Sequence, residues 1–330
     1  MKTRWKNLFD NFKKNKIIII GDIMMDTYIM GKVERISPEA PVPVVDIEEK
    51  INKLGGAANV ALNIFELGAT PIICSIIGKD ERGFELDDLL TKNGLITNFI
   101  YKSNNRKTTN KIRIIGNNTQ MLRIDEETKN DIDDDIFLRL KENIIYAVAN
   151  NKIDAIIFQD YDKGVITKKI IDYIMNLSIK RKIPIFVDPK YRNFNSYKNI
   201  RIFKPNFNEL KGGLNEEIYI EKYREINPFV EKLMKDQNID IFYTTMGNRG
   251  IYLSYKDKDK IVHSHIEGEK RSVADVSGAG DTVMSVATLL NINGVDIKET
   301  ARISNIAGGM VCEKVGVVPI NKNDLLNEII

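Results

Sequence analysis

The chain has 330 residues, of which 43% are hydrophobic and 29% are charged, and its formal net charge is only +3. This composition suits one large or two small globular domains with a substantial core, and it argues against a disordered chain. The near balance of acidic and basic residues argues against nucleic acid or an anionic membrane as a partner bound through bulk charge. An anionic ligand would therefore need a local cluster of basic side chains.

The first residues contain a basic stretch followed by an aliphatic run at 17–20, which Gly21 and Asp22 end after four isoleucines. Such a run is far too short for a signal peptide or for a membrane span of about 20 apolar residues, so a cytoplasmic protein is predicted. A short aliphatic run ended by Gly-Asp is typical of a buried parallel strand whose carboxyl end opens into a site. Cys74 and Cys312 each lie in an apolar run and are expected to be buried free thiols.

A proline-rich passage at 36–44 lies between two short β-like pieces. Its pattern is too regular for a linker, and it holds too many prolines for a central strand. Farther along, two more β-like pieces flank Gly116-Asn117-Asn118, as expected of a hairpin. We predict that residues 27–50 and 110–125, approximately, form a small sheet that covers the functional site as a lid.

Strands and helices alternate through the rest of the chain. Strands are predicted at 16–20, 72–78, 96–101, 155–158, 183–188, 202–204, 239–245, 251–255 and 261–266, the last with both histidines on an exposed face. Helices are predicted at 57–67, 82–93, 131–149, 167–180, 217–235, 278–291, 297–312 and 322–329. This alternation predicts an α/β fold in which a doubly wound, mostly parallel sheet is flanked by helices, in a single domain over residues 1–330.

The most informative stretch runs from Asp275 to Thr282 and contains Gly278-Ala279-Gly280 directly before a predicted helix. Small residues let backbone amides approach a ligand, and the positive end of the helix dipole points to the same place, which predicts an anion site. General base catalysis would give the carboxylate of Asp281 a role there. A plain helix cap is the alternative for this stretch taken alone. A Rossmann fingerprint, and with it a dinucleotide-dependent oxidoreductase, is excluded because Val283 stands where the third glycine is required.

Polar residues gather at the predicted carboxyl ends of the strands, where open α/β sheets bind their ligands. They are Asp22, Asp160, Lys163, Lys190, Asn206, Glu209, Thr245 and Gly247. Asn206 and Glu209 are three residues apart at a helix start, a placement that suits the ordering of water around a Mg²⁺ ion carried by substrate phosphates. A capping box made by the same two residues is the alternative.

Four motifs occur in the order and spacing of the ribokinase/PfkB family of sugar kinases, which the chain resembles from about residue 16 to 320. They are Gly55-Gly56 followed by Asn59, Asn206-x-x-Glu209, Thr245-x-Gly247-x-x-Gly250 and Gly278-Ala279-Gly280-Asp281. Five further segments look like those of the D-glycero-β-D-manno-heptose 7-phosphate kinases. They are 21–26, 35–44, 55–61, 122–125 and Asp160-Tyr161-Asp162-Lys163-Gly164.

This resemblance implies an ATP-dependent kinase that phosphorylates the heptose 7-phosphate at its anomeric C1 hydroxyl. Asp281 would take the proton of that hydroxyl, while the amides of Gly278, Ala279 and Gly280 would hold the charge that develops on the transferred phosphoryl group. The sugar side would be formed by Asp22, Asp26, Gly55, Gly56 and Asn59. The nucleotide side would be formed by Lys190, Asn206, Glu209, Thr245, Gly247, Gly250 and Asn305, with Glu209 acting on Mg²⁺ through water. Some members also bind K⁺ near the positions of Asp275 and Gly316, and for this chain the question stays open.

A substrate that already carries a phosphate needs basic partners. The candidates are Lys111, Arg113, Arg123 and Lys163, which the sequence does not rank. A solvated strand face is the alternative explanation for the three on the predicted hairpin. Lys204 stands where relatives usually have Thr, as does Ser277, and Lys204 is expected to alter nucleotide contacts.

The resemblance also bears on the product and the assembly. No H-x-G-H motif of an appended adenylyltransferase occurs in this chain, so only the 1,7-bisphosphate is expected, for nucleotide-activated heptose and the lipopolysaccharide core. The apolar edge at 42–45 predicts a homodimer through the lid, although an edge folded over its own domain fits equally well. The alternatives for function are another PfkB kinase, for fructose, ribose or a nucleoside, and a non-catalytic sugar or nucleotide sensor.

Overall fold

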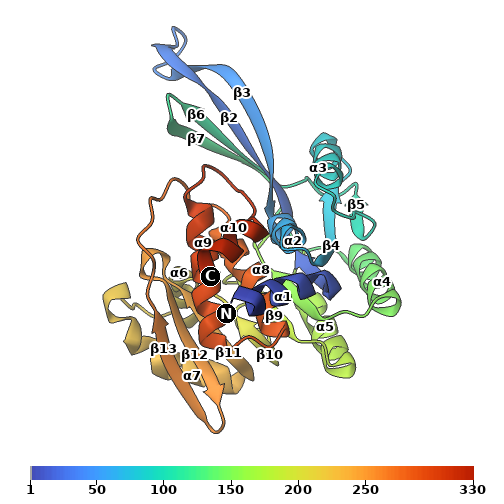
Figure 1. Ribbon diagram of the computed structural model, residues 1–330. Coiled ribbons are helices and arrows are strands. Elements are labelled where there is room, and N and C mark those ends of the chain that lie inside the picture. The colour runs from blue at the N-terminus through green and yellow to red at the C-terminus, as the bar shows by residue number, and fades with distance from the viewer. Residues whose placement is uncertain (1) are drawn as a thin grey trace.

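The computed structural model describes residues 2–330, which form a large sheet covered by helices and a smaller sheet that projects from it (Figure 1). The strands of the large sheet are β1 (Lys16–Gly21), β4 (Thr70–Gly78), β5 (Ile100–Ser103), β8 (Ala155–Gln159), β9 (Ile185–Asp188), β10 (Ile200–Phe203), β11 (Ile239–Thr245), β12 (Ile251–Asp257) and β13 (Lys260–Ile266). Their order is β13-β12-β11-β10-β9-β8-β1-β4-β5, and only the β11/β12 and β12/β13 pairs are antiparallel. The predicted mostly parallel sheet is confirmed.

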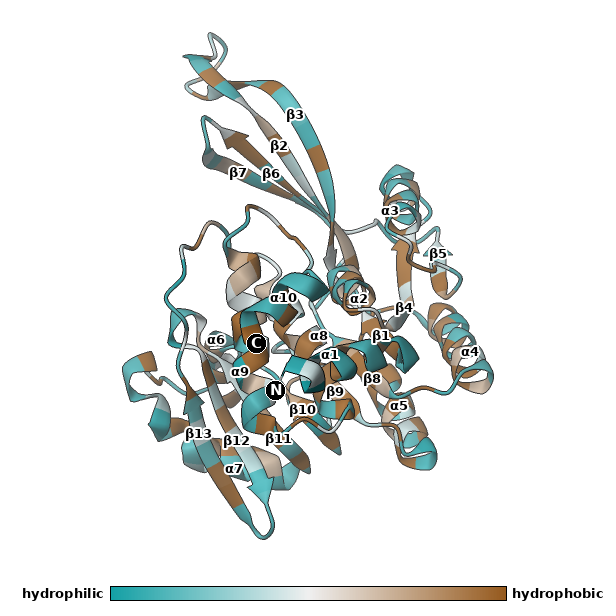
Figure 2. Ribbon diagram, in the orientation of Figure 1, coloured by the Kyte–Doolittle hydropathy of each residue, from teal (hydrophilic) through white to brown (hydrophobic). Residues whose placement is uncertain are grey.

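The isoleucines of β1 explain why this strand is central. All four are fully buried, and Ile17 and Ile19 pack into one hydrophobic cluster while Ile18 and Ile20 pack into the other. Since successive side chains of a strand point to opposite faces, the unbroken apolar run reflects burial of both faces of the sheet. Figure 2 shows the same hydrophobic colouring on β1 and β8, between the helices.

Helices cover both faces of the large sheet. One cluster is covered by α1 (Lys2–Asn11), α2 (Ala57–Glu66), α3 (Glu81–Lys92), α8 (Ala279–Ile292), α9 (Ile297–Cys312) and α10 (Lys322–Ile329). The other is covered by α4 (Asp134–Asn150), α5 (Lys168–Arg181), α6 (Phe207–Leu214) and α7 (Asn227–Asp236). None of these helices, within residues 2–330, is both long and apolar enough to cross a bilayer.

Three local predictions differ from the structure. Helix α1 was not predicted, although Trp5 and Phe9 are buried at helical spacing. The predicted helix at 217–235 is divided into a 3₁₀ segment, η2 (Ile220–Ile226), and α7, because Lys222 has non-helical backbone angles. The two histidines of β13 are half-buried rather than exposed. Neither lines the cleft described below.

The smaller sheet contains β2 (Ile23–Ile36), β3 (Pro43–Gly56), β6 (Asn110–Gly116) and β7 (Thr119–Glu126), in the order β3-β2-β6-β7. The structure thus unites the two segments predicted for a lid, and this sheet is called the lid below. Its first two strands are 14 residues long, and the proline-rich passage forms their turn. Asn117 and Asn118 have φ of 49° and 62°, the left-handed pair that a two-residue hairpin turn requires.

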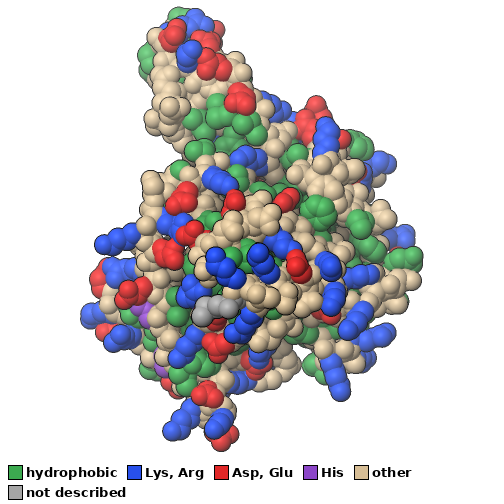
Figure 3. Space-filling view, in the orientation of Figure 1, with side chains coloured by type: hydrophobic (Ala, Val, Ile, Leu, Met, Phe, Trp, Pro, Cys, Tyr) green, Lys and Arg blue, Asp and Glu red, His purple; other side chains and the backbone are tan. Residues whose placement is uncertain are grey.

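The two faces of the lid have different chemistry. One face carries Asp26, Tyr28, Lys53, Lys111, Arg113, Arg123 and Asp125, and the other carries Ile29, Ile112, Ile114, Leu122 and Ile124. The first face turns toward the large sheet, because the Lys111 ammonium lies 5.5 Å from the ring centroid of Tyr161. It is called the inner face of the lid, and the second is called the outer face. Hydrophobic side chains gather on the lid in Figure 3, and Leu122 on the second face is 54% exposed.

Candidate active site

A cleft of about 780 Å³ lies beyond the carboxyl ends of β8, β9 and β11, with the first turn of α8 as one wall. Ligands of open α/β sheets bind at this edge. All seven residues predicted for the nucleotide line the cleft: Lys190, Asn206, Glu209, Thr245, Gly247, Gly250 and Asn305. They do so together with Gly278, Ala279, Gly280 and Asp281. The structure therefore brings the predicted nucleotide residues and the predicted base into one space.

Glycine is required at the entrance of α8. Gly278 precedes the helix with φ of +81°, and a Cβ atom there would lie 2.7 Å from Nδ2 of Asn59. Both the backbone angle and the close approach exclude a larger residue. The N–H group of Ala279 donates to the backbone oxygen of Val276 over 3.3 Å, whereas those of Gly280 and Asp281 have no acceptor within the helix and are available to an anion in the cleft.

Asp281, in the first turn of α8, is only 3% exposed and accepts three hydrogen bonds. Asn59 donates from Nδ2 to Oδ2 over 2.8 Å. Gln159 donates from Nε2 to Oδ1 over 3.0 Å, and the Tyr161 hydroxyl donates to the same oxygen over 2.8 Å. The donors come from α2, from the end of β8 and from the loop that follows β8, so three separate elements fix this carboxylate.

Burial raises the pKa of Asp281 to about 7. The hydrogen bonds from Asn59 and Tyr161 lower this pKa, the charge of Asp188 raises it, and the charge of Lys204 lowers it. A carboxylate that titrates near neutral pH can hold the proton that a sugar hydroxyl loses during reaction, which an ordinary exposed aspartate does poorly.

A buried ion pair lies beside this carboxylate. Nζ of Lys204 is 2.9 Å from Oδ2 of Asp188, and both side chains are almost fully buried. Gln159 connects the pair to the base, because its Nε2 also donates to Asp188 over 3.0 Å. The sequence singled out Lys204 as a departure, and the structure places it in the wall of the cleft. Sequence reasoning missed Gln159 and Asp188 as site residues, although Asp188 ends one predicted strand and Gln159 directly follows another.

Asn206 and Glu209 form the capping box that was the alternative for them. Asn206 accepts from the backbone N–H of Glu209 over 2.9 Å, and Glu209 accepts from the backbone N–H of Asn206 over 2.8 Å. The other oxygen of Glu209 forms an ion pair with Lys190. Within residues 2–330 there is no group of three or more metal-binding side chains. Because both oxygens of Glu209 already have protein partners, Glu209 fits contact with a metal ion through water, as Mg²⁺ commonly allows.

Three of the predicted sugar contacts, Asp22, Gly55 and Gly56, make close contacts within the protein, and their role in sugar binding stays a prediction. Asp22 is buried and accepts from the backbone N–H groups of Tyr161, Lys163 and Val165 over 2.9, 3.2 and 3.1 Å, so it holds the loop after β8. A Cβ atom on Gly55 would lie 2.1 Å from Oδ2 of Asp26, and one on Gly56 would lie 2.4 Å from the backbone oxygen of Asp22. These glycines are explained by close packing inside the protein.

Asn59 also has protein partners, because its side chain is fully buried and its amide contacts Asp281 and Asn63. It orients the predicted base, and its contact with a sugar stays a prediction. Asp26 lies on the inner face of the lid and forms an ion pair with Arg113. Its role in sugar binding stays a prediction.

The four basic candidates differ in whether their charge is already paired. Arg113 pairs with Asp26, Arg123 pairs with its strand neighbour Asp125 over 2.9 Å, and Lys163 pairs with Glu127 over 2.8 Å. No carboxylate of residues 2–330 lies within 4.0 Å of the Lys111 ammonium. Burial lowers the pKa of Lys111. Its charge is therefore the one of the four that most needs an anionic partner.

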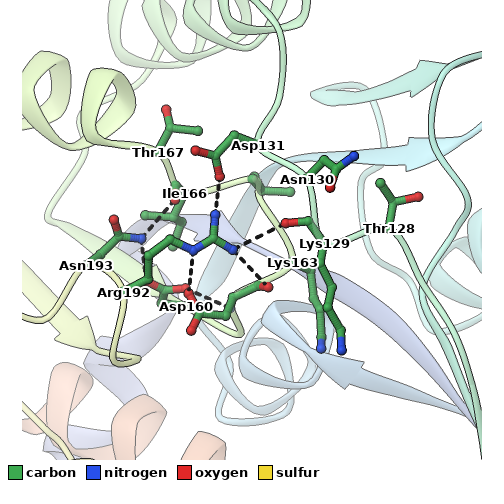
Figure 4. A network of polar contacts seen from close by, with 12 residues as sticks. Thr128, Lys129, Asn130, Asp131, Asp160, Lys163, Ile166, Thr167, Arg192 and Asn193 are labelled. Carbon is green, nitrogen blue, oxygen red and sulfur yellow. Dashed lines mark hydrogen bonds and ion pairs between the residues drawn. The ribbon is translucent and has the colours of Figure 1, made fainter. Parts of the chain in front are cut away.

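The loop after β8 is held in place by a polar network (Figure 4). Arg192 forms an ion pair with Asp131 and donates to the backbone oxygens of Lys129 and Asp162, each over 3.3 Å. Arg106, just before β6, donates to the backbone oxygens of Asn130, Thr128 and Lys163. These contacts tie the connections of the lid to the loop that carries Tyr161.

The two thiols have different environments. Cys74 is fully buried as predicted, and burial raises its pKa to about 12. The prediction for Cys312 is wrong, because it is only half-buried and lines the cleft near the end of α9. An apolar run does not distinguish a core position from a cleft wall.

The fold is shared with solved kinase structures. Phosphofructokinase-2 from Escherichia coli, in complex with potassium, superposes with a TM-score of 0.75 at 16% identity over 95% of this chain and 97% of that chain. A ribokinase from Arabidopsis thaliana, complexed with ribose and ATP, superposes with a TM-score of 0.68 at 19% identity over 95% of this chain and 98% of that chain. At these identities the likeness shows the ribokinase-like α/β fold alone.

Sequence comparison is more specific. The "Bifunctional protein HldE" of Koribacter versatilis is 34% identical over 100% of this chain and 67% of that protein. The chain spans about two thirds of the length of the curated relatives that it matches. The family described as "pfkB family carbohydrate kinase" matches residues 14–323. Because this match covers nearly the whole chain, the protein belongs to the pfkB family of carbohydrate kinases.

Proposed function

We propose that this kinase transfers the γ-phosphoryl group of ATP to the anomeric C1 hydroxyl of D-glycero-β-D-manno-heptose 7-phosphate. The product would be the 1,7-bisphosphate, a precursor of nucleotide-activated heptose for the lipopolysaccharide core. The motif resemblance to heptose 7-phosphate kinases supports this substrate. The observation that carries the proposal is the inner face of the lid, where Lys111 presents a half-buried ammonium group on the side of Asp281, with no carboxylate partner among residues 2–330.

The position of Lys111 suits a phosphorylated substrate. Its ammonium group lies 5.5 Å from the ring centroid of Tyr161, and the hydroxyl of the same ring lies 2.8 Å from Asp281. A sugar whose reacting hydroxyl approaches Asp281 therefore extends toward a cation at its other end. A phosphate group gives such a buried cation its charge partner. A kinase for unphosphorylated ribose or a nucleoside would have no use for this charge.

The proposed chemistry assigns a task to each wall of the cleft. Asp281 takes the proton of the sugar hydroxyl as its oxygen attacks the γ-phosphorus of ATP. The N–H groups at the start of α8 stabilise the charge on the transferred group. Lys190 contacts the phosphates of ATP. When bound, Mg²⁺ neutralises phosphate charge, and Glu209 meets it through water. Asp275 accepts hydrogen bonds from the backbone N–H groups of Ser277 and Gly316. Some members of the family bind K⁺ near these positions, so the dependence of activity on K⁺ should be measured.

The test is a substrate panel. Purified protein is given ATP, Mg²⁺ and, in separate reactions, heptose 7-phosphate, fructose 6-phosphate, ribose and a nucleoside, and ADP release is measured. We expect the highest kcat/KM with heptose 7-phosphate. Preference for an unphosphorylated sugar would overturn the proposal. Absence of turnover with every sugar would favour the sugar or nucleotide sensor.

A matched pair of variants tests the phosphate contact. Lys111→Met should raise KM for the phosphorylated sugar by about tenfold or more, since a charge-assisted hydrogen bond is lost, and should leave KM for ATP unchanged. Lys152→Met, an exposed position before β8, is the control. An unchanged KM in Lys111→Met would move the phosphate site to Arg123 or Lys163.

We also propose that the protein forms a homodimer through the lid. The outer face of the lid exposes apolar side chains that a monomer would leave in water, among them Leu122 and Ile124. Light scattering should give twice the mass of one chain. Leu122→Lys should return the mass to that of a monomer, whereas an unchanged mass would refute an interface at this face.

A further inference from the structure

The acceptor oxygen of Asp281 is determined by its neighbours. We propose that Tyr161 and Gln159 are positioning residues that saturate Oδ1 of Asp281 and so reserve Oδ2 for the proton of the acceptor hydroxyl. The proposal rests on the proposed role of Asp281 as the base. It applies to any sugar that this kinase phosphorylates and does not depend on the heptose.

The hydrogen-bond count supports this assignment. Each oxygen of an ionised carboxylate accepts about two hydrogen bonds. Oδ1 of Asp281 receives two donors, Gln159 over 3.0 Å and Tyr161 over 2.8 Å, whereas Oδ2 receives one, Asn59 over 2.8 Å. Among residues 2–330, these are the side chains that donate to this carboxylate, so one position on Oδ2 stays open for a substrate hydroxyl.

The direction of the Gln159 amide is fixed by its surroundings. Its Nε2 donates to two carboxylates, Asp281 and Asp188, each over 3.0 Å. A flipped amide would place its oxygen against two negative charges, which is strongly unfavourable. Oε1 of Gln159 is buried without a hydrogen-bond partner within residues 2–330. A buried carbonyl oxygen without a hydrogen-bond partner is costly. The two hydrogen bonds that Nε2 donates offset this cost and therefore decide the position of the Gln159 side chain.

Tyr161 is held by its backbone as well as by Asp281. Asp22 accepts its N–H group, and the Arg192 network holds the same loop. Burial and the charge of Asp281 raise the pKa of the Tyr161 hydroxyl well above its usual value, so this hydroxyl stays protonated and acts as a donor. The other charged groups that face Asp281 are Asp188, Lys204 and Lys190. None of them donates to Oδ1.

The proton balance of the step follows. The O–H bond of the sugar breaks and its proton moves to Oδ2, while the sugar oxygen bonds to the γ-phosphorus and ADP leaves with the electron pair of the broken P–O bond. Because Oδ1 keeps its two donors throughout, the carboxyl group needs no rotation. The donors also favour the ionised form of Asp281, which keeps the base available near neutral pH.

The test compares Tyr161→Phe with Tyr146→Phe, the same change at an exposed position on α4. Loss of one hydrogen bond to the carboxylate should move the acidic limb of the kcat profile upward by about one pH unit and lower kcat at pH 7 by about fivefold. KM for ATP and KM for sugar should stay the same, since the aromatic ring and its contacts with Lys111 and Lys190 are retained. The control should match the unchanged enzyme.

A second variant and a reference keep the outcomes distinct. Gln159→Met removes the other donor to Oδ1 and should move the limb in the same direction, with retained secondary structure verified by circular dichroism. Asp281→Asn distinguishes the role of Asp281 as the base from the positioning roles of Tyr161 and Gln159. If that variant stays active, the proposed base is wrong. If it is inactive while Tyr161→Phe and Gln159→Met keep the original limb, the present inference is overturned.

Discussion

Replacing Asp188 by Asn is expected to extend kinase activity to lower pH. Nε2 of Gln159 lies 3.0 Å from Oδ2 of Asp188 and 3.0 Å from Oδ1 of Asp281, so these two oxygens are separated by at most twice that distance, 6.0 Å. Two unit charges at that separation repel by about 2.8 kcal/mol at an effective dielectric constant of about 20. This repulsion corresponds to about two pKa units. Asn keeps the shape of the side chain and removes the charge.

The direction of the pH shift follows from the protonation state in which Asp281 reacts. Asp281 must be ionised to accept a proton, and its pKa is raised to about 7, so activity falls as pH drops through that value. Without the charge of Asp188 its pKa falls, and the acidic limb should move downward by about one to two pH units. The assay is kcat at saturating ATP and sugar from pH 5 to 9, with ADP release as the readout.

Lys204→Met provides the opposite perturbation at the same ion pair. It removes the positive charge that lowers the pKa of Asp281 and leaves Asp188 unpaired, so the acidic limb should move upward. Opposite shifts in Asp188→Asn and Lys204→Met would be hard to obtain from general damage to the site. Shifts in the same direction, or none, would refute the electrostatic argument.

Three further variants test the start of α8 and of α6. Asp281→Asn should lower kcat by about 10²-fold or more without loss of thermal stability at pH 5, since the raised pKa of Asp281 makes its burial unfavourable there, and near-normal turnover would falsify its role as base. Gly278→Ala should lower the free energy of unfolding by about 1–3 kcal/mol, since φ is +81° and the added methyl group would meet Asn59; urea titration measures it, and an unchanged midpoint contradicts it. Asn206→Ala should cost about 1 kcal/mol in the same titration through loss of the cap, and a gain in stability would argue against that cap.

The sequence predicts the large sheet well because its signal is local. Strands β1, β4, β8 and β9 of that sheet are short apolar runs, and most helices between the strands have clear apolar periodicity. The lid strands were predicted too short because residues 46–53 are mostly charged or polar. These residues pair with β2 through backbone hydrogen bonds. Such pairing does not require alternating apolar side chains, so the sequence shows no strand pattern there. Helix α1 had a signal in the spacing of Trp5 and Phe9, and it was overlooked.

The nucleotide side of the site was predictable because the carboxyl ends of parallel strands meet at one edge of a sheet. The sugar side was harder, since burial decides what a polar residue does. Asn59 and Asp281 are 222 residues apart in sequence, and nothing local shows that one amide is occupied by the other. Gln159 and Tyr161 follow the same rule, because their place at the end of β8 does not show that both donate to Asp281.

If the lid binds the sugar as proposed, its alternating faces make the alignment of its strands a determinant of substrate choice. Lys111 and Arg113 face inward only because β6 pairs with β2 as it does, and the neighbouring Ile112 faces outward for the same reason. A shift of β6 by one residue would exchange the two sets and present isoleucines to the sugar. Insertion or deletion of one residue in the connection at 104–109, which leads into β6, is the change in length that could cause this shift, and it would leave the nucleotide cleft intact. Evolution of new sugar preferences in such lids is more easily achieved by substitution than by changes in length.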